Sequence, residues 1–105
     1  MAFAPINILD LPSRPMDAEQ TDVLLSDGGV RVERIVSSGQ TTDWYDQAET
    51  EFVALISGQA VIEYADGETV TLAAGDTLLI EPHEKHRVAY TSANPPCIWL
   101  CVFYG

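Results

Sequence analysis

GQTTDWYDQAETEFVALISG, residues 39–58, is the stretch from which the fold prediction starts. It opens with an acidic, aromatic segment, continues into the apolar residues 52–56, and closes on Ser57 and Gly58. A continuous apolar run that ends at a turn is typical of a strand buried on both faces. We therefore expect residues 52–56 to form a buried strand, with polar side chains gathered just before it.

The next two segments, 60–64 and 68–72, predict a hairpin around an Asp-Gly turn. A two-residue turn would place Ile62 opposite Thr71. A three-residue turn, with its glycine in the left-handed conformation, would place Ile62 opposite Val70. Because the second register gathers the apolar side chains on one face, we expect the three-residue turn.

Further β-forming segments extend over 23–25, 30–37, 77–80, 86–90 and 97–104, separated by turns rich in Gly and Pro. Short strands at a spacing of roughly 8–12 residues, with no helical period between them, are typical of a β-sandwich or a small barrel. The sequence therefore predicts an all-β fold. In 86–90, alternation predicts that His86, Val88 and Tyr90 share one face of the strand.

Residues 1–22 contain Pro5, Pro12 and Pro15, which exclude a long helix because proline lacks a backbone donor. We expect an extended arm held by its apolar residues, followed by a barrel over 23–104, in a single domain of 105 residues. Segment 97–104 is apolar on both faces, which indicates burial on both sides or a subunit contact. We expect a homodimer through this segment and the arm.

The composition limits the partners. Sixteen acidic residues against five basic ones give a formal net charge of −11. Such a surface repels nucleic acid and anionic membranes, so neither is an expected partner. The longest apolar runs, about five residues, are too short to span a bilayer. The N-terminus lacks the basic and apolar regions of a secretory signal, so we expect a cytoplasmic protein.

Cys97 and Cys101 lie four residues apart in one predicted strand. Their Cα atoms would then be roughly 13 Å apart, whereas a disulfide needs less than about 7 Å. We expect two free, buried thiols, which fit a reducing compartment.

Two motifs in the chain resemble those of the cupin family. The first motif of that family is Gly, five residues, His-x-His, three or four residues, Glu, six residues, Gly. In this sequence the same spacing falls on Gly39, Tyr45, Gln47, Glu51 and Gly58. The glycines and the glutamate match, while Tyr45 and Gln47 stand at the two histidine positions.

The second cupin motif is Gly, five residues, Pro-x-Gly, two residues, His, three residues, Asn. Gly75 and His86 match it, and Pro82 is displaced by one position. His83 stands at the second glycine position and Tyr90 at the asparagine position. The resemblance covers about residues 30–104 and implies a small double-stranded β-helix, the jelly-roll barrel of the cupins.

The resemblance also implies a divalent metal site with altered ligands, or a metal-free pocket, in the barrel mouth. On this basis the predicted metal ligands are Gln47, Glu51, His83 and His86. A set rich in oxygen with one or two imidazoles suits Fe, Mn, Ni or Zn. Residues 45, 47 and 51 share parity, so in one extended strand they would face the same way.

Tyr45 and Tyr90 are the predicted catalytic residues, Tyr45 as a group that moves protons and Tyr90 as a phenol that meets the substrate. The sequence predicts a barrel that binds a divalent metal and a small polar metabolite. Because the fold does not choose the reaction, three alternatives stay open: a metal-dependent enzyme, a metal-free binding or sensing module, and a scaffold protein.

Overall fold

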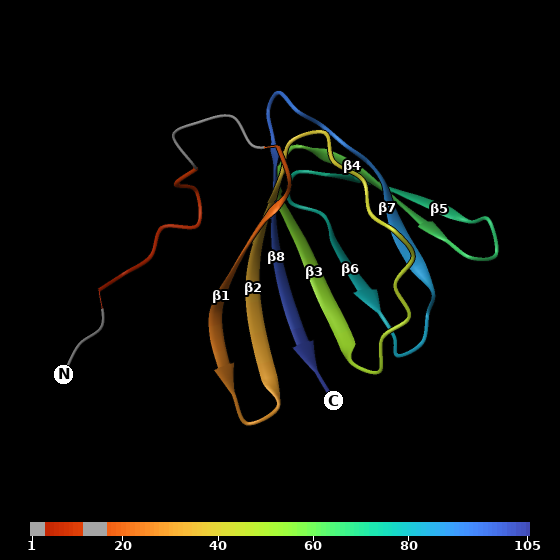
Figure 1. The fold of residues 1–105 in the computed structure, drawn as a ribbon, viewed down its shortest axis with the longest axis horizontal. Coiled ribbons are helices and arrows are strands. Elements are labelled where there is room, and N and C mark those ends of the chain that lie inside the picture. Colours follow the sequence, from red (N-terminus) through yellow and green to blue (C-terminus); the bar gives the residue numbers. More distant parts are fainter. Residues whose placement is uncertain (1–3, 12–16) are drawn as a thin grey trace.

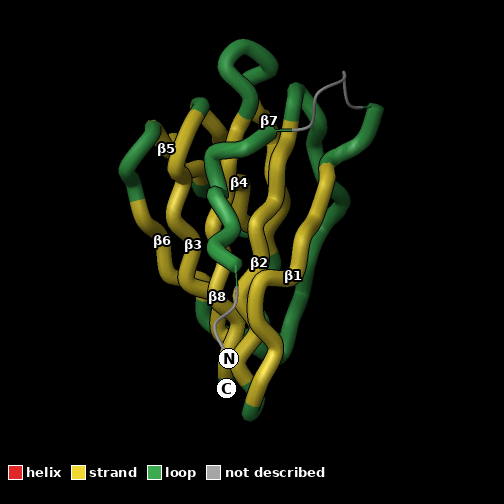
Figure 2. Tube along the Cα trace, turned by 90° about the vertical axis from the view of Figure 1, so that its left-hand side faces the viewer, coloured by secondary structure: helices red, strands yellow, loops and turns green. Residues whose placement is uncertain are grey.

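The computed structural model describes residues 4–11 and 17–105. Within these residues the chain forms strands and no helix (Figure 1, Figure 2). The strands are β1 (Gln20–Asp27), β2 (Val30–Ser37), β3 (Thr50–Ser57), β4 (Gln59–Tyr64), β5 (Thr69–Ala73), β6 (Thr77–Ile80), β7 (His86–Thr91) and β8 (Cys97–Tyr104). The described part of the chain therefore contains no helix that could cross a membrane.

The strands form two antiparallel sheets. The larger sheet has the order β1-β2-β8-β3-β6 and the smaller one the order β5-β4-β7. In Figure 1, β4, β5 and β7 lie to the right of the long strands β1, β2 and β8. The chain passes from the larger sheet to the smaller one at Gly58, between β3 and β4. Gly58 has a φ of 89°, a left-handed conformation that favours glycine.

The hydrophobic core draws on both sheets. Its buried residues are Val53, Leu55, Ala60, Ile62, Leu72, Ile80, Cys97, Trp99, Cys101 and Phe103. They come from β3, β6 and β8 of the larger sheet and from β4 and β5 of the smaller one. Two antiparallel sheets around one core confirm the predicted all-β jelly-roll barrel.

Several local predictions are confirmed. In the β4–β5 hairpin Ile62 pairs with Val70, the register of the three-residue turn. Gly67 has a φ of 93°, as that turn requires. β8 covers the predicted segment 97–104. Cys97 and Cys101 are buried, free thiols.

The prediction that residues 52–56 are buried on both faces is wrong. Glu51, Val53 and Leu55 are buried, but Phe52 between them is 40% exposed. The reason is that one face of the larger sheet packs on the core, while the opposite face of β3 has no layer over it among the described residues. The apolar run therefore alternates between an inner and an outer face.

A β-bulge changes the direction of Tyr90. Ile62 pairs with Val88 and Val61 pairs with Tyr90, which leaves Ala89 as an extra residue in β7. One extra residue moves the following side chains to the opposite face of a strand. His86 is accordingly buried, whereas Tyr90 is 50% exposed. The prediction that Tyr90 shares the face of His86 is wrong.

The described part of the N-terminal arm, residues 4–11, is held by polar contacts. Arg34 Nη1 donates hydrogen bonds to the backbone carbonyls of Ile8 (3.3 Å) and Asp10 (2.6 Å). Leu9 and Leu11 are exposed, so the expectation that apolar residues hold the arm is wrong for this part. The other arm residues, 1–3 and 12–16, lie outside the described residues, and β1 already begins at Gln20.

Candidate functional site

A cavity of about 370 Å³ lies inside the barrel, a volume within the range of small-molecule sites. Part of its wall is apolar and comes from inner-face residues of both sheets, among them Val53, Ile62 and Trp99. The charged and larger polar side chains of the wall are Glu19, Arg31, Glu33, Tyr45, Gln47, Glu49, Glu51 and His86. The cavity therefore combines an apolar surface with a small set of polar groups, as binding sites for small organic molecules do.

Glu51 and His86 form a deeply buried pair of a carboxyl group and an imidazole in this wall. Glu51, the second residue of β3, is 8% exposed, and His86, the first residue of β7, is 4% exposed. His86 Nδ1 lies 2.7 Å from the backbone carbonyl oxygen of Glu84. A carbonyl can only accept, so Nδ1 carries the hydrogen, and in the neutral ring Nε2 has a free lone pair.

His86 Nε2 lies 4.0 Å from Oε1 of Glu51. This separation is too long for a direct hydrogen bond. It is short enough for one bound group to contact both atoms. The pair is therefore placed to act on the same part of a ligand.

Tyr45 and Gln47 reach the cavity without belonging to a strand. Tyr45 forms an isolated bridge with His86, in which Tyr45 N donates to His86 O (2.7 Å) and His86 N donates to Tyr45 O (3.0 Å). Gln47 Nε2 donates a hydrogen bond to Glu51 Oε1 (3.1 Å). The expectation of one strand through residues 45–51 is wrong, since β3 begins at Thr50. The bridge to β7 brings the side chains to the same cavity instead.

Two of the predicted site residues lie away from the cavity wall. His83 occupies the turn before β7 with a φ of 62°, and its side chain is 68% exposed. Its Nδ1 lies 2.7 Å from Oδ1 of Asp46. Tyr90 lies beyond the bulge, on the outer side of β7. The structure thus brings together Tyr45, Gln47, Glu51 and His86, and leaves His83 and Tyr90 apart from them.

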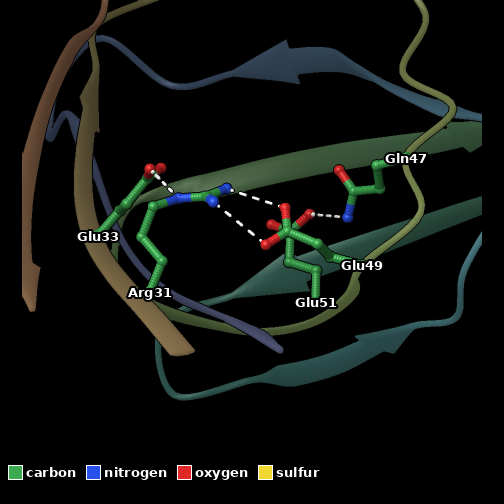
Figure 3. Close-up of polar contacts among 5 residues, drawn as sticks. All are labelled: Arg31, Glu33, Gln47, Glu49 and Glu51. Carbon is green, nitrogen blue, oxygen red and sulfur yellow. Dashed lines mark hydrogen bonds and ion pairs between the residues drawn. The ribbon is translucent and has the colours of Figure 1, made fainter. Parts of the chain in front are cut away.

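Figure 3 shows an ion cluster at the cavity wall that sequence reasoning missed. Arg31 Nε donates to Glu33 (2.7 Å), and its Nη1 and Nη2 donate to the two carboxylate oxygens of Glu49 (3.1 and 3.2 Å). The Arg31 guanidinium carbon also lies 4.3 Å from the centre of the Phe103 ring. The available signal was the pair of opposite charges at positions 31 and 33, which alternation places on the same face of β2 as Ile35.

A second missed feature is the hydrogen-bond chain that holds Glu19. Trp99 Nε1 donates to Ser37 Oγ (3.1 Å), and Ser37 Oγ donates to Glu19 Oε2 (3.3 Å). Trp99 and Ser37 are both buried, so this series of hydrogen bonds begins in the core. Glu19 lies just before β1, and no sequence motif links it to Trp99 in β8.

Burial dominates the electrostatics of the cavity. It raises the pKa of Glu51 above the ordinary 4.5, against the hydrogen bond from Gln47 and the nearby His86, which lower it. Burial also raises the pKa of Tyr45, with further contributions from the negative charges of Glu19 and Glu51. Burial, and then Glu51, raise the pKa of the Cys101 thiol. Cys101 therefore stays a neutral thiol rather than a thiolate ligand.

The polar residues of the cavity do not match a resident divalent-metal site. Glu51 and His86 are ordinary metal ligands, but Gln47 turns its amide nitrogen, which is no ligand, toward Glu51. Among the described residues no three His, Cys, Asp or Glu side chains are grouped as a metal site. Structural and catalytic sites of Zn and similar ions use at least three protein ligands. The donor set is thus one ligand short.

The chain belongs to the cupin family, since the family's cupin domain matches residues 32–103. No curated protein matches it. A solved structure from Ralstonia eutropha JMP134, provisionally named a mannose-6-phosphate isomerase, is 33% identical with a TM-score of 0.88. The similarity covers 96% of this chain and 97% of that protein.

Two further solved structures share the fold. A cupin superfamily protein from Desulfitobacterium hafniense DCB-2 is 16% identical, with a TM-score of 0.74 over 96% of this chain and 98% of that one. Protein NMB1881 from Neisseria meningitidis is 15% identical, with a TM-score of 0.75 over 97% of this chain and 100% of that one. At these identities the likeness establishes the barrel and not a reaction.

Proposed function

We propose that this cupin binds a small polar metabolite in the barrel cavity without a resident metal ion. The observation that carries the proposal is the buried pair of Glu51 and His86, which face each other at 4.0 Å across an otherwise largely apolar wall. A carboxyl group and an imidazole with a free lone pair recognise a ligand by hydrogen bonds. The apolar wall supplies the remaining binding energy by burial.

The same pair suits proton transfer. Burial raises the pKa of Glu51, so its carboxyl group takes up a proton more readily than an exposed glutamate does. His86 Nε2 accepts a proton while its Nδ1–H stays bonded to Glu84 O. Tyr45, which also lines the cavity, can hold the ligand through its hydroxyl group. If the protein is an enzyme, these groups favour isomerisation, epimerisation or elimination by acid–base catalysis.

The name of the Ralstonia eutropha protein suggests a sugar phosphate as a ligand. The cavity has no free cationic side chain among the described residues that could bind a phosphate group. Arg31 is the one Lys or Arg among the described residues that line it, and its guanidinium is already bonded to Glu33 and Glu49. A phosphate group would meet four carboxyl groups in the same wall. We therefore do not extend that substrate to this chain.

Ligand-induced thermal stabilisation tests the proposed function. A ligand at about 100 times its Kd stabilises the folded state by about 2.7 kcal/mol, which is visible as a raised Tm. We expect some small polar metabolites to raise the Tm of the wild type and to lose this effect in Glu51→Gln and His86→Ala. Glu68→Gln, at an exposed position in the β4–β5 turn, is the control.

Mass spectrometry of the stabilising compounds separates an enzyme from a binding or sensing module. Conversion of a compound by the wild type, and not by His86→Ala, identifies an enzyme. Stabilisation without conversion identifies a binding module. If no compound raises the Tm of the wild type, the proposal of a metabolite site is wrong.

A further inference from the structure

The hydrogen-bonding groups that face the cavity are mostly acceptors. Four carboxyl groups line it, those of Glu19, Glu33, Glu49 and Glu51. Arg31 is the one strong cation of the described wall. Its Nε bonds Glu33 and its two terminal nitrogens bond Glu49, so its single positive charge is shared by these two acids, and the other two have no Lys or Arg partner (Figure 3).

The two remaining acids are held in place by neutral donors. Glu19 accepts a hydrogen bond from Ser37 Oγ, which in turn accepts one from Trp99 Nε1. Glu51 accepts one from Gln47 Nε2. Neutral donors orient a carboxylate but do not balance its charge. Two oriented carboxylates therefore line a cavity whose described wall has no free Lys or Arg.

His86 gives independent evidence for a ligand that donates hydrogen bonds. The residue is more than nine-tenths buried, and its Nδ1–H is bonded to Glu84 O. Its Nε2, which faces the cavity, makes no hydrogen bond to the described residues, and the nearest carboxylate oxygen, on Glu51, is 4.0 Å away. In the neutral ring this atom is an acceptor without a donor among the described residues; it stays accessible from the cavity, where a ligand or water can donate a hydrogen bond to it.

We propose that the ligand of this cavity carries a positively charged amine, held by Glu19, Glu51 and His86 Nε2. This inference rests on the proposed function and names the chemical class of the metabolite. An ammonium group has three donors and one charge, so it matches an acceptor-rich wall with unbalanced carboxylates. A phosphate or carboxylate ligand offers only hydrogen-bond acceptors, and its negative charge would be repelled by the carboxylates of the wall.

The aromatic side chains of the wall support the same class. Tyr45, Trp99 and Phe103 all line the cavity. The guanidinium of Arg31 already lies over the Phe103 ring, 4.3 Å from its centre, so this wall accommodates a cation on an aromatic face. The apolar residues around them suit a hydrocarbon portion of the ligand. The matching molecule is thus a small amine with an apolar or ring-shaped body.

Three probes of similar shape test the charge preference: cyclohexylamine, cyclohexanol and cyclohexanecarboxylate. Their affinities are measured by isothermal titration calorimetry, with the indole N–H signal of Trp99 followed by NMR to place the binding in the cavity. We expect cyclohexylamine to bind at least about tenfold more tightly than either of the others, the effect of one charge-assisted hydrogen bond.

Charge-neutralising variants assign the effect to the cavity. Glu19→Gln and Glu51→Gln should each weaken cyclohexylamine binding by about tenfold and weaken cyclohexanol binding by a clearly smaller factor. Glu68→Gln removes the same charge from an exposed position and should change neither. An equal loss in all three variants would show a general attraction to an acidic protein and would overturn the inference.

The remaining outcomes separate the two proposals. Equal or tighter binding of cyclohexanol or cyclohexanecarboxylate in the cavity refutes the amine preference, while the proposed metabolite site stands. If none of the three probes shifts the Trp99 signal, the cavity does not bind small molecules of this size. Both proposals then fail.

Discussion

At the scale of single residues, Gln47 determines whether the cavity has enough ordinary ligands to bind a metal ion. It stands at the second histidine position of the first cupin motif and donates its amide N–H to Glu51. An imidazole at this position would add a third ordinary ligand beside Glu51 and His86. With glutamine, the same wall keeps a hydrogen-bonded carboxyl group, which suits recognition of an organic ligand.

Glu51 should make the stability of the protein depend on pH. Burial raises its folded-state pKa above 4.5, so its contribution to stability is fully present below about pH 4.5 and is lost as the pH rises through the folded-state value. Between about pH 5 and pH 7 the wild type should therefore lose more unfolding free energy than Glu51→Gln does.

Urea denaturation at the two pH values measures this difference. Glu68→Gln, which alters the net charge equally, should retain the pH dependence of the wild type. The same pH dependence in Glu51→Gln and in the wild type would show that Glu51 does not carry the effect.

At the scale of elements, the sequence predicts regular features well and irregular ones poorly. The bounds of β8 and the register of the β4–β5 hairpin follow from local patterns of apolar residues and glycine. The bulge in β7 leaves no such pattern, because Ala89 fits a regular strand equally well. The bridge from Tyr45 to His86 is a contact between distant segments, which alternation cannot predict.

The Gly58 connection between β3 and β4 should tolerate no side chain. A Cβ atom there would lie 2.8 Å from Ser92 Oγ and 2.9 Å from Cys97 Cα, at a φ of 89°. We expect Gly58→Ala to reduce the unfolding free energy by about 3 kcal/mol, from strain and overpacking together.

Gly67→Ala is the matched control for this prediction. It has a similar φ of 93° but nothing within 4 Å of the added Cβ, so it should cost only about 1 kcal/mol. Chemical denaturation measures both variants. Equal losses would mean that backbone strain alone, and not the contact with Ser92 and Cys97, makes glycine necessary at position 58.

At the scale of the whole molecule, the outer face of the larger sheet carries a row of apolar side chains that crosses its strands. Neighbouring strands pair Leu25 with Val32, Val32 with Val102, Val102 with Phe52, and Phe52 with Leu79. Each of these side chains points away from the cavity, and three of them, Leu25, Phe52 and Leu79, are among the exposed large apolar residues. We propose that a second copy of the chain covers this row, which would make the protein a homodimer through a face that includes β8.

Phe52→Lys should separate such a dimer, because it places a charge within the row, between Val102 and Leu79. Analytical ultracentrifugation at micromolar concentration should give a dimer mass for the wild type and a monomer mass for this variant. Tyr90→Lys, at an exposed position on β7 in the smaller sheet, should remain dimeric. A monomeric wild type would remove the proposed dimer.

The candidate site was predictable only where it lies in motifs. Glu51 and His86 follow from the cupin spacing, and the structure places them 4.0 Å apart. Glu19 directly precedes β1 and Arg31 lies in β2, so both residues are outside the two motifs. They reach the cavity because β2 pairs with β8, whose inner face carries Trp99 and Phe103. Such tertiary contacts leave no mark in local sequence.

The measurement that tests the central claim most directly is the metal content of the untagged protein by mass spectrometry, after growth with added Fe, Mn, Ni and Zn. We expect well below one metal ion per chain for the wild type, and a clear gain in Gln47→His, which completes a three-ligand set with Glu51 and His86. Gln59→His, at an exposed position in β4, should gain none. Near-stoichiometric metal in the wild type, lost in Glu51→Ala and His86→Ala, would refute a cavity without a resident metal ion and establish the metal site that the cupin motifs predict.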